Sequence, residues 1–94
     1  MDVIFEWDED KNRLNKRKHG FDFDDAPEVF EGDMLRILDD RDGYGEDRWL
    51  GFGVFRGAVV VIVFTEPDDE TIRIISMRRA NRYERGQYEE AYGV

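Results

Sequence analysis

The run AVVVIVF at residues 58–64 restricts the fold of this chain more than any other segment. β-Branched residues dominate the run, which favours a strand over a helix. No polar residue interrupts it, so both faces of that strand are apolar, which indicates a central strand covered on both sides. The run is far too short to cross a bilayer. In the preceding strand pattern, at 48–55, Gly51 and Gly53 share one face and leave that face bare.

Shorter patterns before and after this run predict the other elements. We expect strands at residues 3–7, 34–38 and 48–55 and a further strand beginning at 71, together with helices at 9–18, 23–30 and 80–92. Polar segments at 39–47 and 66–70 and a tight turn at Arg56–Gly57 separate the later strands. The resulting order, β-α-α-β-β-β-β-α, predicts an α+β fold in which the helices lie against one face of an antiparallel meander sheet.

Individual residues are expected to define the helix ends. Asp8 is a typical N-cap, and Gly20 is typical of the position just after a helix C-terminus. Asp24 is expected to cap the second helix. The first helix contains one apolar residue, Leu14, so we expect it to bury little surface.

Composition excludes several kinds of site. The 94 residues are enough for one domain, spanning 1–94. The absence of cysteine excludes disulfides, cysteine nucleophiles and thiolate metal sites. With a single histidine, we expect no metal and no other cofactor. The acidic N-terminus lacks the layout of a signal peptide, so we expect a soluble cytoplasmic protein without membrane contact.

The charges are unevenly distributed along the chain. The net charge of −9 argues against non-specific nucleic-acid binding. However, residues 11–18 and 71–85 together contain ten of the fourteen Lys and Arg, and Glu84 is the one acid within 71–85. Basic patches on an acidic body can form a focused anion site, and we expect the anion to be RNA. Alternatively, these arginines pair with surface acids and have only a structural role.

Short motifs in a fixed order give the sequence a resemblance to a known family. They are FEWD at 5–8, Lys11, Asn15, KHG at 18–20, Phe23, Ala26, VF at 29–30, DRD at 40–42, GEDRW at 45–49, FTE at 64–66 and RIISMRRA at 73–80. Together they cover about residues 5–90 and resemble the BrnT toxins. Met77 stands where that family commonly has a small residue.

The resemblance implies a fold, an activity and a partner. BrnT proteins are toxins of type II toxin–antitoxin systems, with a RelE-like fold and a ribonuclease activity that arrests translation. Their partner BrnA is a ribbon-helix-helix antitoxin, and the complex represses its own operon, so operator DNA would be contacted only through the antitoxin. Ribbon-helix-helix proteins dimerise, so we expect two toxins on one antitoxin dimer. A non-catalytic co-repressor in the same complex is the alternative.

Cleaving RNA without a metal requires a base for the 2′-hydroxyl, cations for the extra phosphate charge and an acid for the leaving oxygen. By analogy with RelE-like sites on the sheet, Arg73 and Arg78 are the expected catalytic arginines. Arg48 and Arg79 are expected to bind the phosphate through bidentate contacts. Ser76 lies outside any nucleophile motif, and we expect its hydroxyl to donate a hydrogen bond to the phosphate or to the protein.

The acid and the base are harder to assign from the sequence. His19 is the expected acid, because the end of the first helix should stabilise its protonated form; capping of that helix is the alternative role. RelE-like enzymes can work without histidine, so Lys16 or Lys18 can substitute, with Lys18 also expected to bind substrate. Glu66 is the candidate base unless it merely begins a turn, and its neighbour Thr65 is expected to contact the substrate.

Overall fold

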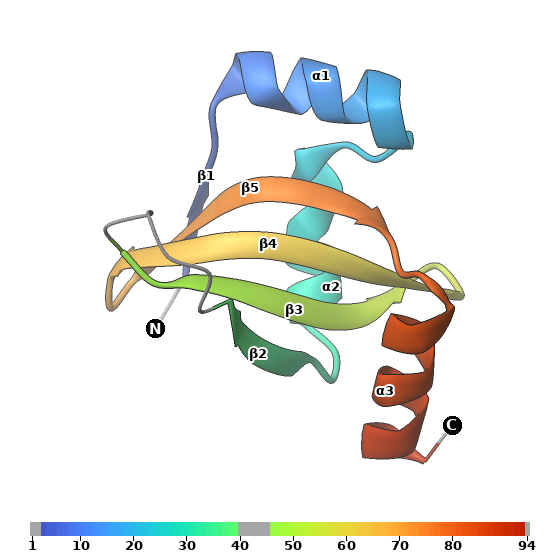
Figure 1. Ribbon diagram of the computed structural model, residues 1–94. Coiled ribbons are helices and arrows are strands. Elements are labelled where there is room, and N and C mark those ends of the chain that lie inside the picture. The colour runs from blue at the N-terminus through green and yellow to red at the C-terminus, as the bar shows by residue number, and fades with distance from the viewer. Residues whose placement is uncertain (1–2, 40–45, 94) are drawn as a thin grey trace.

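The structure, a computed structural model, describes residues 3–39 and 46–93 (Figure 1). The elements are β1 (Ile4–Glu6), α1 (Glu9–His19), the 3₁₀ helix η1 (Phe23–Asp25), α2 (Ala26–Phe30), β2 (Leu35–Asp39), β3 (Arg48–Phe55), β4 (Ala58–Asp68), β5 (Thr71–Arg79) and α3 (Arg82–Tyr92). The predicted α+β class is confirmed, and strands and helices follow one another in the predicted order. The motif at 40–42 and the first residue of the motif at 45–49 lie outside the described residues.

The five strands form one sheet in the order β1-β5-β4-β3-β2. β2 to β5 are an antiparallel meander, as expected. β1, however, pairs in parallel with β5, so the prediction of a wholly antiparallel sheet is wrong at this strand. The reason is topological: α1, η1 and α2 lie between β1 and the meander, and β1 joins the sheet beside its last strand (Figure 1).

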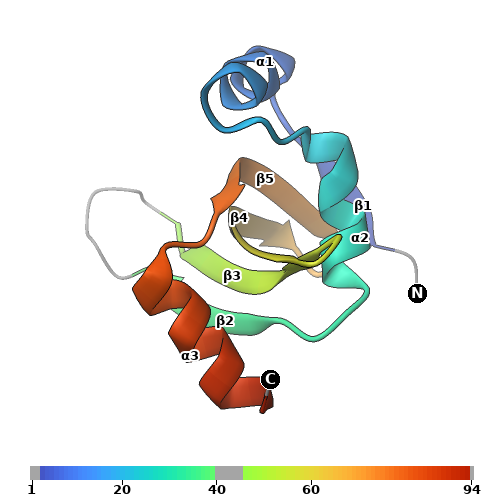
Figure 2. The ribbon, with the colours of Figure 1, turned by 90° about the vertical axis from the view of Figure 1, so that its right-hand side faces the viewer.

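Helices cover both faces of the sheet, which corrects the expectation of helices on one face. One face, here called the α2 face, carries Val60, Ile62 and Phe64 of β4 and packs against η1 and α2. The opposite face, here called the α3 face, carries Val61, which packs with Tyr88 of α3. Figure 2 shows α2 and α3 on opposite sides of the sheet. The two-sided apolar run at 58–64 therefore does lie in a strand covered on both faces, as predicted.

Most predicted element ends are confirmed. Asp8 caps α1, accepting hydrogen bonds from the backbone of its first turn, and Gly20 ends this helix with a positive φ of 80°. The second helix differs from the prediction because the 3₁₀ helix η1 precedes α2. Asp22, not Asp24, is the N-cap of η1 and accepts a hydrogen bond from the Asp24 N–H. Arg56 and Gly57 both have positive φ, as the tight β3–β4 turn requires.

The last hairpin is longer than the sequence suggested. β4 continues to Asp68, through the segment expected to form a turn, and β5 continues to Arg79 before α3 begins. An Asn81–Glu84 capping box starts α3, so the last helix begins after residue 80 rather than at it. The long β5 therefore places Arg73, Arg78 and Arg79 in the sheet, whereas Arg82 and Arg85 lie in α3.

The face of β3 that carries Gly51 and Gly53 is covered by α2, although the sequence predicts a bare face there. A Cβ at Gly53 would lie 2.6 Å from Cγ1 of Val29, a buried residue of α2. At Gly51 it would lie 2.6 Å from the sulfur of Met34 and 3.0 Å from Phe64. The missing side chains allow the short helix to approach the sheet closely.

We therefore expect Gly53→Ala to lower the free energy of unfolding by about 1–3 kcal/mol, because Val29 is stiff and buried and cannot yield to the new methyl group. Urea denaturation would measure the change. Gly86→Ala is the matched control: Gly86 lies inside α3 with open space around it, so this substitution should raise stability by roughly 0.5–1 kcal/mol. An unchanged stability for Gly53→Ala would contradict the close approach.

Candidate active site

The side chain of Asn15 holds α1 against the free edge of β5. β1 pairs with residues 71–73 of β5, and among the described residues no strand adjoins the edge beyond them. There the Asn15 side-chain amide donates to the Met77 carbonyl at 2.8 Å, and the Met77 N–H donates to Asn15 Oδ1 at 3.1 Å. Asn15 thus replaces one residue of a missing strand.

A second buried asparagine fixes the same helix to the segment that follows it. The Phe23 N–H donates to Asn12 Oδ1 at 2.9 Å, and Asn12 Nδ2 donates to Asp22 at 3.0 Å. The residues that α1 buries are therefore Asn12 and Asn15, whereas its one apolar residue, Leu14, is 60% exposed. Hydrogen bonds of these two asparagines, rather than apolar contacts, hold α1 in its position against the rest of the protein.

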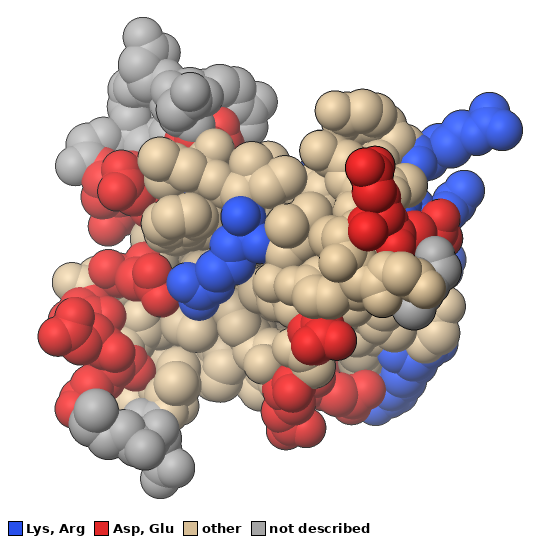
Figure 3. Space-filling model, turned by 90° about the horizontal axis from the view of Figure 1, so that it is seen from below, with Lys and Arg blue, Asp and Glu red and all other residues tan. Residues whose placement is uncertain are grey.

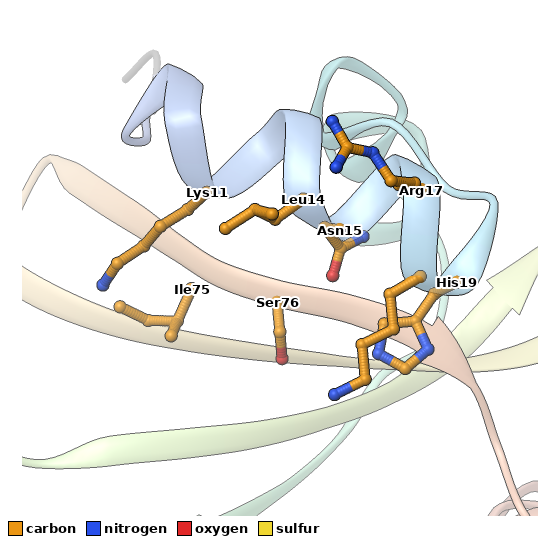
Figure 4. A pocket seen from close by; sticks show the side chains of 8 residues that line it. Lys11, Leu14, Asn15, Arg17, His19, Ile75 and Ser76 are labelled. Carbon is orange, nitrogen blue, oxygen red and sulfur yellow. The ribbon is translucent and has the colours of Figure 1, made fainter.

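A groove of about 610 Å³ lies between α1 and β5 (Figure 4). α1 lines it with basic, polar and apolar residues, and β5 contributes two neighbours; the lining residues are Lys11, Leu14, Asn15, Arg17, Lys18, His19, Ile75 and Ser76. The strand register shifts at this point, so that Ile75 has no partner on β4. Such a bulge turns two successive side chains outward, which explains why Ile75 and Ser76 both reach the groove.

The register of the sheet brings most of the predicted site residues that lie on strands to the α3 face. On β5, Arg78 lies opposite Val61, Ser76 opposite Val63, and Arg73 opposite Thr65. Val61 belongs to the cluster under α3, and alternate residues of β4 share its face. Arg73, Ser76, Arg78 and Thr65 are therefore on one face.

Arg48 lies on the same face. Its neighbour Trp49 packs on the α2 face, so Arg48 points to the opposite side of β3. Thr65 differs from the others because it is completely buried, and its Oγ1 has no hydrogen-bond partner among the described residues. Thr65 is therefore buried beside its cross-strand neighbour Arg73 and is not exposed at the surface.

Three predicted residues lie elsewhere. Glu66 is on the α2 face, where it pairs with Arg36 at 3.3 Å; the guanidinium of Arg36 stacks over the Phe64 ring at 4.9 Å. Arg79 follows Arg78 and so points to the α2 face as well. Lys16 does not line the groove and pairs with Asp22 at 3.4 Å. Glu66 and Arg79 thus lie away from His19, whereas Lys16 is on the same helix but is directed to Asp22.

His19 is the last residue of α1, and its partly buried imidazole lines the groove. Loss of solvent lowers the pKa of His19, and the charges of Lys18 and Arg78 lower it further. These effects together favour the neutral imidazole, whereas the helix end was expected to favour the protonated form. A helix end is equivalent to about half a negative charge, while burial and two full cations oppose the protonated form.

Arg78 is held by Glu84, the third residue of α3. Both terminal nitrogens of Arg78 donate to the two carboxylate oxygens of Glu84 at 2.8 Å. These bonds raise the pKa of Arg78 and lower the pKa of Glu84. Arg73, at the other end of the same face, pairs with Glu6 at 2.9 Å, but this pair is much more exposed.

The groove is basic although the molecule as a whole is acidic. Lys11, Arg17 and Lys18 of α1 line it, and none of its described lining residues is an acid. Figure 3 shows the molecule from below, where several groups of acidic side chains lie with basic side chains among them. Within residues 3–39 and 46–93, no three His, Asp or Glu side chains cluster as a metal site requires. In the same part of the chain, no helix is long and apolar enough to cross a membrane.

Comparison with known proteins identifies the family. Residues 7–84 match the model of the family described as "Ribonuclease toxin, BrnT, of type II toxin-antitoxin system". The chain belongs to the BrnT family. A solved structure that it resembles is the crystal structure of the ribonuclease toxin BrnT of Brucella abortus, at a TM-score of 0.62 and 31% sequence identity, covering 87% of this chain and 99% of that one. A comparison with curated proteins found no match.

Membership of the BrnT family confirms the resemblance seen in the sequence. The family consists of ribonuclease toxins of type II toxin–antitoxin systems, and such a system includes an antitoxin partner. The matched segment contains every residue predicted for the site, from Lys16 to Arg79, and it ends at Glu84, the partner of Arg78.

Sequence analysis missed the residues that position the site in this BrnT toxin. Asn15 was noticed as part of a family motif, but it received no role. Asn12 and Asn15 are three positions apart and so lie on one face of α1, which is the signal that was available for them. Glu84 was counted only as an acid among arginines, and its contact with Arg78 depends on the turn between β5 and α3.

We expect Asn15→Ala to lower the free energy of unfolding by on the order of 2–4 kcal/mol, because the backbone N–H and carbonyl of Met77 lose their partners. Thermal and urea unfolding would measure the loss. Arg13→Ala, an exposed residue on the same helix that pairs with Asp10, should change stability by less than about 0.5 kcal/mol. Equal stabilities for the two variants would contradict the anchoring role of Asn15.

Proposed function

We propose that this BrnT toxin is a metal-independent endoribonuclease whose active site lies where the end of α1 meets β5. The observation that carries the proposal is the place of His19 beside Lys18 in the groove, where burial and the charges of Lys18 and Arg78 lower its pKa. A neutral imidazole can accept a proton, and nearby cations can stabilise the negative charge that develops on phosphorus. The two requirements meet in one groove.

In the proposed reaction His19 is the base rather than the acid. Its imidazole takes the proton of a ribose 2′-hydroxyl, and the 2′-oxygen attacks the adjacent phosphorus. The bond from phosphorus to the 5′-oxygen breaks, which leaves a 2′,3′-cyclic phosphate and a 5′-hydroxyl. Lys18, which lines the groove beside His19, would protonate the departing 5′-oxygen.

The remaining residues of the α3 face would bind the phosphates. Arg78 would stabilise the reacting phosphate, and the Ser76 hydroxyl would donate a hydrogen bond to it. Arg73 of β5 and Arg48 of β3 would contact neighbouring phosphates of the RNA. Thr65 lies buried beside Arg73 on the neighbouring strand. Glu66 and Arg79 have no part in this arrangement, since both point to the α2 face, and neither has Lys16, which pairs with Asp22.

The biological role follows from the family. We propose that cleavage takes place in the cytoplasm and arrests translation, and that the domain is RelE-like. The neutralising partner would be a BrnA-type ribbon-helix-helix antitoxin whose dimer carries two toxins and binds the operator DNA. The acidic total charge of −9 favours one alternative, a toxin that has lost its RNA affinity and acts only as a co-repressor.

Cleavage of RNA by the purified chain in excess EDTA would test the proposal. We expect fragments ending in 2′,3′-cyclic phosphate, and a loss of about 100-fold or more in rate for Arg78→Ala. Arg85→Ala, which removes a cation from exposed helix α3, is the control and should keep the rate within about twofold of wild type. Circular dichroism would confirm that both variants fold.

Two outcomes of this assay would contradict the proposal. Intact RNA at every toxin concentration, together with tight binding of the antitoxin, would establish the co-repressor alternative. Cleavage that stops in EDTA and returns with a divalent ion would show that the reaction depends on a metal.

The dependence of cleavage on pH separates the base role of His19 from the acid role. Because the pKa of His19 lies below its ordinary value of about 6.5, the neutral imidazole should persist as the pH falls to that value. We therefore expect kcat/KM of the wild type to decline only below about pH 6.5. The His19→Ala variant should lose most of the activity, and its remaining activity should no longer show this decline at low pH. A rate that rises as the pH falls would instead identify a protonated, acidic His19.

A further inference from the structure

We infer that Glu84 is a positioning residue of the active site, which holds the guanidinium of Arg78 in one orientation beside His19. This inference rests on the proposed catalytic role of Arg78. Glu84 does not line the groove, and it belongs to α3, a different element from those that form it.

The contact between Glu84 and Arg78 is well suited to fixing an orientation. Two parallel bonds of 2.8 Å join the planar guanidinium to the planar carboxylate, which restricts both tilt and rotation. The side chain of Glu84 is only 12% exposed and that of Arg78 31%, so water competes weakly for these bonds. The Arg36–Glu66 and Arg73–Glu6 pairs are about 40% exposed.

Arg78 keeps donors for a substrate despite this contact. One hydrogen of each terminal nitrogen goes to Glu84, and Nη1 also lies 3.3 Å from the Arg79 carbonyl. Since a guanidinium has five N–H donors, the second hydrogen of Nη2 and the Nε hydrogen remain for a phosphate. Glu84 therefore anchors the arginine without occupying all of its bonding capacity.

The start of α3 fixes Glu84 in turn. The Asn81 N–H donates to Glu84 Oε1 at 2.9 Å, and the Glu84 N–H donates to Asn81 Oδ1 at 2.8 Å. Farther along the helix, buried Tyr88 packs against the α3 face of the sheet, and its hydroxyl donates to the Asp33 carbonyl at 3.2 Å. The docking of α3 thus determines where the carboxylate, and through it Arg78, lies.

The obvious competing role for Glu84 is to weaken Arg78 by neutralising its charge. The two roles predict opposite effects of removing the carboxylate. If Glu84 positions Arg78, loss of the carboxylate frees the guanidinium and slows the reaction. If Glu84 only screens charge, its loss strengthens phosphate binding and speeds the reaction.

Glu84→Gln tests the inference in the full-length protein with a short RNA substrate. Glutamine also serves at this position of a capping box, so α3 should form while the charged fork to Arg78 is lost. We expect kcat to fall by about 10- to 100-fold, with KM changed by less than about threefold. Loss of the negative charge should also move the low-pH decline in rate to lower pH, because Arg78 then acts on His19 without its counter-charge.

Two matched variants separate positioning from stability. Gly53→Ala destabilises the face of the sheet opposite α3 and keeps the Arg78–Glu84 pair, so it should lower the melting temperature and leave kcat near that of wild type. Glu90→Gln removes an exposed carboxylate from the same helix and should change neither quantity. In the Arg78→Ala background, Glu84→Gln should cause no further loss of kcat, because the residue it positions is gone.

The outcomes distinguish this inference from the proposed function. Wild-type or faster cleavage by Glu84→Gln, in an assay where Arg78→Ala is inactive, overturns the positioning role alone. Full activity of both variants overturns the role of Arg78 as well. NMR of the wild-type guanidinium provides a measurement that needs no variant: a restrained Arg78 shows separate Nη signals, and signals averaged by free rotation would overturn the inference.

Discussion

The pair of hydrogen bonds between the Asn15 amide and the Met77 backbone is the contact on which the geometry of the site depends. Within the part of the chain that the structure describes, no strand pairs with the edge of β5 beyond residue 73, and backbone groups buried there without partners would cost free energy. One amide side chain supplies both a donor and an acceptor and so satisfies that edge. Because Asn15 is fixed, the last turn of α1 lies beside the bulge of β5. His19 of α1 and Ser76 of β5 therefore line the same groove.

The site combines three elements that are separate in sequence. α1 contributes the imidazole and the lysine, β5 contributes the arginines and the serine, and α3 contributes the carboxylate that restrains Arg78. Each contribution depends on a polar contact between elements, since apolar packing alone does not orient a planar side chain. The bulge at Ile75 has a related effect, because it turns a residue toward α1 that a regular strand would direct elsewhere.

The strongly acidic composition is compatible with an anion site because Lys11, Arg17 and Lys18 line the groove and none of its described lining residues is an acid. Acidic side chains lie elsewhere, for example on the side seen in Figure 3, and some of them pair with other cations. Burial lowers the pKa of His19, and the charges of Lys18 and Arg78 lower it further. The cations that would bind phosphate in the proposed reaction thus also favour the neutral imidazole.

Local patterns in the sequence determined the α+β class, the caps at Asp8 and Gly20, the Arg56–Gly57 turn, the two-sided burial of β4 and the family. These follow from the chemistry of neighbouring residues. Tertiary structure alone decided the parallel pairing of β1, the helices on both faces, the separation of Glu66 and Arg79 from the site, and the lowered pKa of His19. Strand register and burial decide which distant side chains meet, and a pKa depends on the charges and solvent that the fold places around it.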